Sequence, residues 1–126
     1  LPACQALYYE LQRVDLLALP FATVWATGDV LESILLGVLY HGRGVTTIGT
    51  TDIRQVELGP LLKEAKDVPV FPSKSVVSAC DLVHIFRNRI HPGNEMRQKY
   101  KLTARAARTL KILFEHSLLE WRKAFP

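Results

Sequence analysis

Cysteine is scarce in this sequence, with only Cys4 and Cys80 among 126 residues and no Cys-x-x-Cys pair. A chain of this length can bury enough apolar surface to fold without disulfides or a structural metal. Neither cysteine has an arranged His or Asp partner in the sequence, so we expect no serine- or cysteine-type catalytic triad. We predict a single domain over residues 1–126, in a reducing, cytoplasmic setting.

Long apolar runs and dense basic runs are also missing. The most apolar segment, residues 34–40, is too short to cross a bilayer, so we expect no membrane partner. The first residues lack a basic start and a long apolar stretch, which argues against a secretory signal peptide. The net charge of +4 permits an RNA or DNA partner without demanding one.

Metal-binding and phosphate-loop patterns are absent from the sequence as well. The four histidines are His41, His84, His91 and His116, and they form no His-x-x-x-His or His-Glu-x-x-His set. That spacing predicts no zinc site, and we expect no other cofactor. The segment Gly42-Arg43-Gly44 is not a phosphate loop, because no strand precedes it and no helix opens directly after it.

What the sequence does contain is five segments with helical spacing of apolar residues, separated by proline and glycine. We expect helices at residues 5–19, 20–41, 57–67, 73–91 and 103–123. Ser73 and Thr103 are candidate N-caps, and residues 45–52 can hold a short strand or none. Three long segments with short joints predict an all-α, antiparallel four- to five-helix bundle, with the third helix as a lateral cover.

Two further expectations concern single side chains of these helices. Trp25 and Trp121 fall at core spacing, so both are expected to pack inside. The basic residues of the last helix are expected to point mostly outward; they are Arg105, Arg108, Lys111, Arg122 and Lys123.

The end of the fourth segment, Arg87-Asn88-Arg89-Ile90-His91-Pro92-Gly93, is the stretch most suggestive of chemistry. At about 100° per residue, Arg87, His91 and His84 share one flank of the helix. A neutral His can serve as a general base while Arg binds phosphate in a bidentate fork, which suits RNA cleavage by internal transfer without a metal. The alternative is structural: the pair caps the helix end, or Arg87 forms an ion pair with Asp29 or Glu32 of the second helix.

The helix order, together with Phe86-Arg87-Asn88-Arg89-Ile90-His91-Pro92, resembles the HEPN superfamily over residues 20–122. The active pattern of that family is Arg, a polar residue that is often Asn, three or more further residues, and His. Arg87, Asn88 and His91 match its ends, but the spacing is one residue short, and Gly93 stands where the family often has Tyr. The resemblance implies a dimeric helical bundle: a metal-independent RNase of toxin or antiphage systems, or a non-catalytic binding module.

The resemblance also implies roles for individual residues. Arg87 would position phosphate, His91 would act as base or acid, and Asn88 would orient one of them. The fourth helices would pair about a twofold axis in a homodimer, so that Arg87 and Arg89 from both chains, with His84 and His91, line one basic groove. Arg97 and Lys99 belong to a basic cluster that is either a solvated face or a strip contacting phosphate.

Because the motif is one residue short, the prediction favours a non-catalytic module over an RNase. We predict a HEPN-like dimerisation or interaction module, with RNA as a candidate ligand and with weak or absent catalysis. The setting that the resemblance implies is prokaryotic defence or a toxin system, with a larger-protein or operon partner. The alternative is a metal-independent endoribonuclease using Arg87 and His91.

Overall fold

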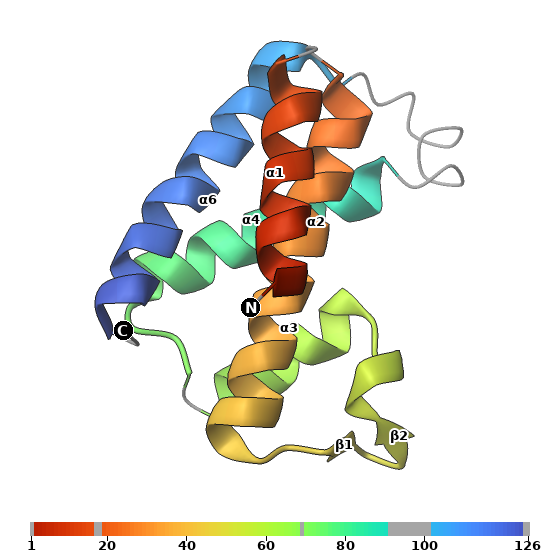
Figure 1. Cartoon of the computed structure of the whole chain (residues 1–126), viewed down its shortest axis with the longest axis vertical. Helices are drawn as coiled ribbons and strands as arrows, with labels where there is room; N and C mark the ends of the chain where they lie inside the picture. Colours follow the sequence, from red (N-terminus) through yellow and green to blue (C-terminus); the bar gives the residue numbers. More distant parts are fainter. Residues whose placement is uncertain (1, 17–18, 69, 91–101, 125–126) are drawn as a thin grey trace.

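The computed structural model of the chain describes residues 2–16, 19–68, 70–90 and 102–124. Within these ranges the regular secondary structure is helical apart from one small hairpin, which confirms the predicted all-α class. The helices are α1 (Pro2–Leu16), α2 (Pro20–Gly37), α3 (Leu58–Asp67), α4 (Lys74–Arg89) and α6 (Ala104–Ala124). In Figure 1, α1 and α2 lie side by side in opposite directions, α6 flanks them, and α4 crosses behind them.

The starts of the long helices follow local signals in the sequence. Pro20 occupies the first turn of α2, where its missing N–H costs nothing. The Ser73 hydroxyl accepts a hydrogen bond from the Val76 amide at the start of α4, and the Thr103 hydroxyl accepts one from the Ala106 amide at 3.1 Å at the start of α6. Both predicted N-caps are therefore confirmed. α1 begins at Pro2, three residues earlier than predicted.

The connection between α2 and α3 contains the only strands in the described residues. α2 continues into a π-helical turn, Val38–Gly42. Strands β1 (Thr47–Ile48) and β2 (Thr51–Asp52) then pair in antiparallel register around Gly49, whose φ of 63° favours glycine. A short 3-10 turn, Ile53–Gln55, leads into α3.

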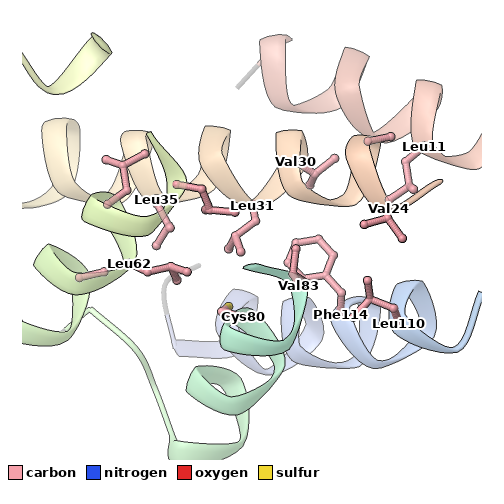
Figure 2. Close-up of a cluster of buried hydrophobic side chains, with 14 of the residues drawn as sticks. Leu11, Val24, Val30, Leu31, Leu35, Leu62, Cys80, Val83, Leu110 and Phe114 are labelled. Carbon is pink, nitrogen blue, oxygen red and sulfur yellow. The ribbon is translucent and has the colours of Figure 1, made fainter. Parts of the chain in front are cut away.

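α2 is the centre of the bundle, because it packs against α1, α3, α4 and α6. Its side chains Val24, Leu31 and Leu35 have no exposed surface. Figure 2 shows them pointing toward residues of the neighbouring helices, including Val83 of α4 and Phe114 of α6. Burying each such side chain stabilises the fold by roughly 1.5–3 kcal/mol relative to leaving it exposed.

The run Pro20–Gly42 is long and apolar enough, by length and composition, to cross a membrane. The expectation that no segment could cross a bilayer came from residues 34–40, which are only part of this longer run. In the fold, this run is the core helix of the bundle, and its apolar side packs against four other helices. Its acidic residues Asp29 and Glu32 form ion pairs with α4.

Two side chains differ from expectation, although the other basic residues of the last helix, Arg105, Arg108, Arg122 and Lys123, are exposed as expected. Trp25 is 46% exposed, because its ring lies outside the core and covers an arginine of α4. Lys111 is buried rather than outward, because it lies between carboxylates of α1 and α6. The expectation for Trp121 is confirmed: it is buried, and its indole N–H donates to the Val70 carbonyl oxygen at 3.0 Å.

Candidate functional site

Arg87 lies in the last turn of α4 and reaches across to α2. Its Nη1 donates to Glu32 Oε1 at 2.8 Å, and its Nη2 donates to Asp29 Oδ1 at 3.2 Å. The two carboxylates are three residues apart on α2, so they lie on the same face of that helix. The Arg87 side chain is only 17% exposed. The structural alternative for Arg87, an ion pair with the second helix, is therefore what the structure contains.

Two further residues of α2 shape the place that Arg87 occupies. The Trp25 ring lies beneath the guanidinium, with the Arg87 Cζ 4.3 Å from the ring centroid, which is cation–π geometry. Gly28 leaves room for the arginine stem, because a Cβ at this position would lie 2.7 Å from Arg87 Cδ. We call Trp25, Gly28, Asp29, Glu32 and Arg87 the Arg87 cluster.

The carboxylates of the Arg87 cluster are partly withdrawn from water, with the Asp29 side chain 43% exposed and the Glu32 side chain 32% exposed. Burial raises the pKa of Asp29, and this outweighs the lowering effect of Arg87. Burial also raises the pKa of Glu32, and the negative charge of Asp29 adds to that shift. The ion pair therefore compensates only part of the desolvation of its acids.

His84 and Asn88 form a second pair on α4, one turn apart. The Asn88 amide nitrogen lies 3.2 Å from His84 Nε2, so the amide donates and the ring nitrogen accepts. The His84 ring packs on α3 at Gly59, where a Cβ would lie 3.2 Å from the ring. Arg87 thus contacts α2 while His84 contacts α3, and the two side chains do not converge on one point.

The remaining predicted site residues divide into one that the structure describes and three that it does not. Arg89 is exposed at the end of α4. His91, Arg97 and Lys99 lie outside the described residues. The pairing of an arginine with His91 therefore stays a prediction.

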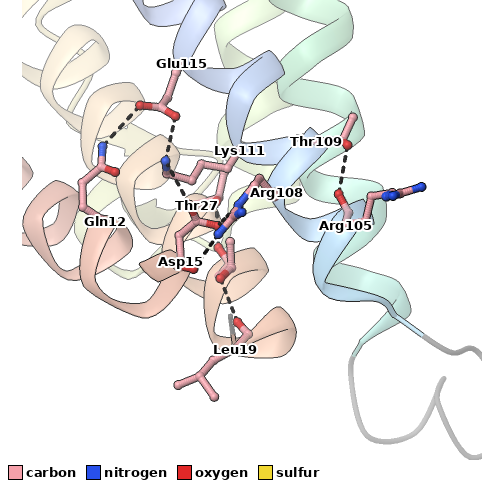
Figure 3. Close-up of polar contacts among 10 residues, drawn as sticks. Gln12, Asp15, Leu19, Thr27, Arg105, Arg108, Thr109, Lys111 and Glu115 are labelled. Carbon is pink, nitrogen blue, oxygen red and sulfur yellow. Dashed lines mark hydrogen bonds and ion pairs between the residues drawn. The ribbon is translucent and has the colours of Figure 1, made fainter. Parts of the chain in front are cut away.

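A polar network that the sequence did not reveal joins α1 to α6. Lys111 Nζ lies 3.3 Å from Asp15 Oδ2 and 2.9 Å from Glu115 Oε1, and its side chain is 9% exposed. Glu115 also accepts hydrogen bonds from the Tyr8 hydroxyl and from the Gln12 amide at 3.2 Å. Figure 3 shows Gln12, Lys111 and Glu115 converging between the helices. We call these five residues the α1–α6 network.

Burial and hydrogen bonding together set the pKa values of Tyr8, Lys111 and Glu115 in the α1–α6 network. Burial raises the pKa of Glu115, but hydrogen bonds from Tyr8 and Lys111 outweigh it and hold the pKa below its ordinary value. Burial, with Glu115 nearby, raises the pKa of Tyr8 to about 12. Burial lowers the pKa of Lys111, but Glu115 and Asp15 outweigh that effect and raise it. The network is therefore charged at neutral pH.

Metal and thiol chemistry find little support in the described part of the chain. No group of three or more His, Cys, Asp or Glu side chains there could hold a metal ion. Cys80 is buried, and burial raises the pKa of its thiol to about 12, which makes it a poor nucleophile at neutral pH.

The chain matches no protein-family model, no curated protein and no solved structure in comparisons with known proteins. The functional argument therefore depends on the geometry of the molecule.

Proposed function

We propose that the chain is a HEPN-like helical module for dimerisation or interaction, in which Arg87 has a structural role. The observation that carries the proposal is the double ion pair of Arg87 with Asp29 and Glu32. One cation between two carboxylates gives the cluster a net charge of −1 when both acids are ionised. Such a cluster repels a phosphate, whereas an RNase needs a cation presented to the scissile group.

Phosphate would also have to compete for a guanidinium that is already bound. Both Nη atoms of Arg87 donate to carboxylates, and one face of the guanidinium lies on Trp25. A bidentate fork to an external phosphate would require breaking these contacts. The one-residue shortening of the motif between Arg87 and His91 points the same way. We propose RNA as a ligand of the basic residues Arg89, Arg97 and Lys99.

The setting is proposed by resemblance alone. The active HEPN proteins are RNases of toxin, antiphage and CRISPR-associated systems, and by that resemblance we propose a prokaryotic defence or toxin context in the cytoplasm for this chain, with a larger-protein or operon partner.

An RNA cleavage assay in EDTA tests the proposal directly. We expect the wild-type protein to leave single-stranded RNA intact, so that wild type and His91→Ala behave identically. A companion urea titration should show that Arg87→Ala lowers stability while His91→Ala has little effect, since Arg87 joins two helices. EDTA-resistant cleavage that disappears in His91→Ala would overturn the proposal and establish the endoribonuclease alternative.

A further inference from the structure

A cleft of about 800 Å³ lies between α1 and α6, with α2 as its floor. In Figure 1, α1 and α6 lie close together at the top and separate downward. The floor is a single stripe formed by Val30 and Ile34 of α2 and by Val38 of the π-helical turn that continues it, at four-residue spacing. The α1–α6 network bridges the two helices, and Tyr8 and Glu115 of that network line the cleft. We call this cleft the α1–α6 groove.

The rims of the groove carry the two most exposed large apolar side chains among the described residues. Tyr9 on α1 is 69% exposed, and Leu119 on α6 is 60% exposed. Each therefore projects into solvent directly beside an apolar hollow. A twofold interface uses one patch twice, so a projection next to a hollow is the shape that a second copy of the same chain can fill.

The charges along α6 agree with a second copy in an antiparallel orientation. Glu115 and Arg122 both line the groove, on either side of Leu118 and Leu119. A twofold axis passing between Leu118 and Leu119 leaves each charge about three and a half residues from the axis, so Arg122 of one copy lies level with Glu115 of the other. Within the described part of the chain, Arg122 has no carboxylate partner of its own.

We propose that the α1–α6 groove is the homodimer interface, with α6 of a second copy lying antiparallel to α6 and Leu119 seated in the groove. This inference rests on the dimerisation role within the proposed function, and it assigns the contact to α6. The HEPN resemblance implies pairing through α4 instead. The apolar floor supplies affinity, and two Arg122–Glu115 pairs fix the direction of the helices.

Sedimentation equilibrium of the full chain tests this assignment. Leu119→Lys places a charge in the apolar contact on both sides of the axis, and we expect it to weaken the dimer about tenfold or more. The matched control is Leu113→Lys, because Leu113 lies on the same helix at 45% exposure but outside the groove. Circular dichroism of both variants verifies that α6 still folds.

The charge pairing has its own matched variants. Arg122→Glu brings like charges together across the axis, so we expect it to weaken the dimer. Lys123→Glu makes the same charge change at an exposed neighbour that does not line the groove, and it should leave the dimer intact.

Each alternative outcome has a defined meaning. If Ile85→Lys on α4 dissociates the dimer while Leu119→Lys does not, the groove assignment is overturned and the proposed function survives. A wild-type protein that remains monomeric overturns both the groove assignment and the dimer on which it rests.

Discussion

The Arg87 cluster and the α1–α6 network contain the same charges but hold them differently. Each has one poorly exposed cation between two carboxylates: Arg87 between Asp29 and Glu32, and Lys111 between Asp15 and Glu115. In the Arg87 cluster, burial raises the pKa of both acids. In the α1–α6 network, the pKa of Glu115 is lowered.

The difference comes from the number of hydrogen-bond donors around each acid. Glu115 accepts from Tyr8 and Gln12 in addition to its pair with Lys111. Among the described contacts, Glu32 accepts only from Arg87. The free-energy cost of ionising a partly buried carboxylate is small only when several hydrogen-bond donors replace the water that it has lost. The α1–α6 network therefore compensates the desolvation of its carboxylates better than the Arg87 cluster does, although Arg87 belongs to the predicted motif.

The largest expected effect follows from removing Lys111, the cation of the α1–α6 network. Lys111→Met leaves Asp15 and Glu115 facing each other in a partly buried place, so we expect a loss of up to about 3 kcal/mol in the free energy of unfolding. Urea denaturation at neutral pH measures it. Lys123→Met, on the exposed side of the same helix, should change stability by less than about 0.5 kcal/mol. A cost for Lys111→Met as small as that of the control would mean that the network contributes nothing.

An intermediate effect is expected at the contact between Gly28 and Arg87. Gly28→Ala places a methyl group 2.7 Å from Arg87 Cδ. We expect crowding of about 1–3 kcal/mol, offset by about 1 kcal/mol of improved helix propensity, so the expected net loss of stability in the wild type is at most about 2 kcal/mol. In an Arg87→Ala background the crowding disappears, and the same substitution should become stabilising.

A double-mutant cycle by urea denaturation measures this change of sign. Gly59→Ala provides the control, because its added methyl group would meet His84 rather than Arg87. Its effect should therefore be the same with and without Arg87. If Gly28→Ala remained destabilising in the Arg87→Ala background, Arg87 would not be what excludes a side chain at position 28.

Local signals were the part of the fold that the sequence predicted well. Pro20, Ser73 and Thr103 define helix starts through contacts within one turn, so no knowledge of neighbours is needed. The partners of Arg87 were predicted only as one of two alternatives. Helical spacing gives the face on which Arg87 lies, but not the helix that covers that face.

Trp25 and Lys111 show why the remaining contacts could not be predicted. Trp25 falls at core spacing along α2, yet it lies at the edge of the α2–α4 contact and covers a cation. Lys111 is a charged residue on a helix face that happens to meet Asp15 of α1, nearly a hundred positions away. The spacing of apolar residues within one helix does not indicate which residue of another helix will lie against Trp25 or Lys111.

The smallest effect that we expect is a difference in pH dependence between the two sites. The pKa of Glu32 is raised above 4.5, so its carboxylate penalises the folded state as pH rises from about that value through the folded pKa. Relative to the wild type, Glu32→Gln should therefore become less costly as pH rises. The pKa of Glu115 lies below 4.5, so its contribution to stability is present above that value and is lost as pH falls through the folded pKa.

Glu115→Gln should consequently cost most near neutral pH and progressively less in acid, which is the opposite trend from Glu32→Gln. Urea titrations of both variants and the wild type, from neutral pH to below pH 4, measure the two slopes. Because both substitutions are Glu to Gln, changes in size and helix propensity cancel in the comparison. If the costs of the two variants change with pH in the same direction, then the number of hydrogen-bond donors does not explain how the two sites stabilise their carboxylates.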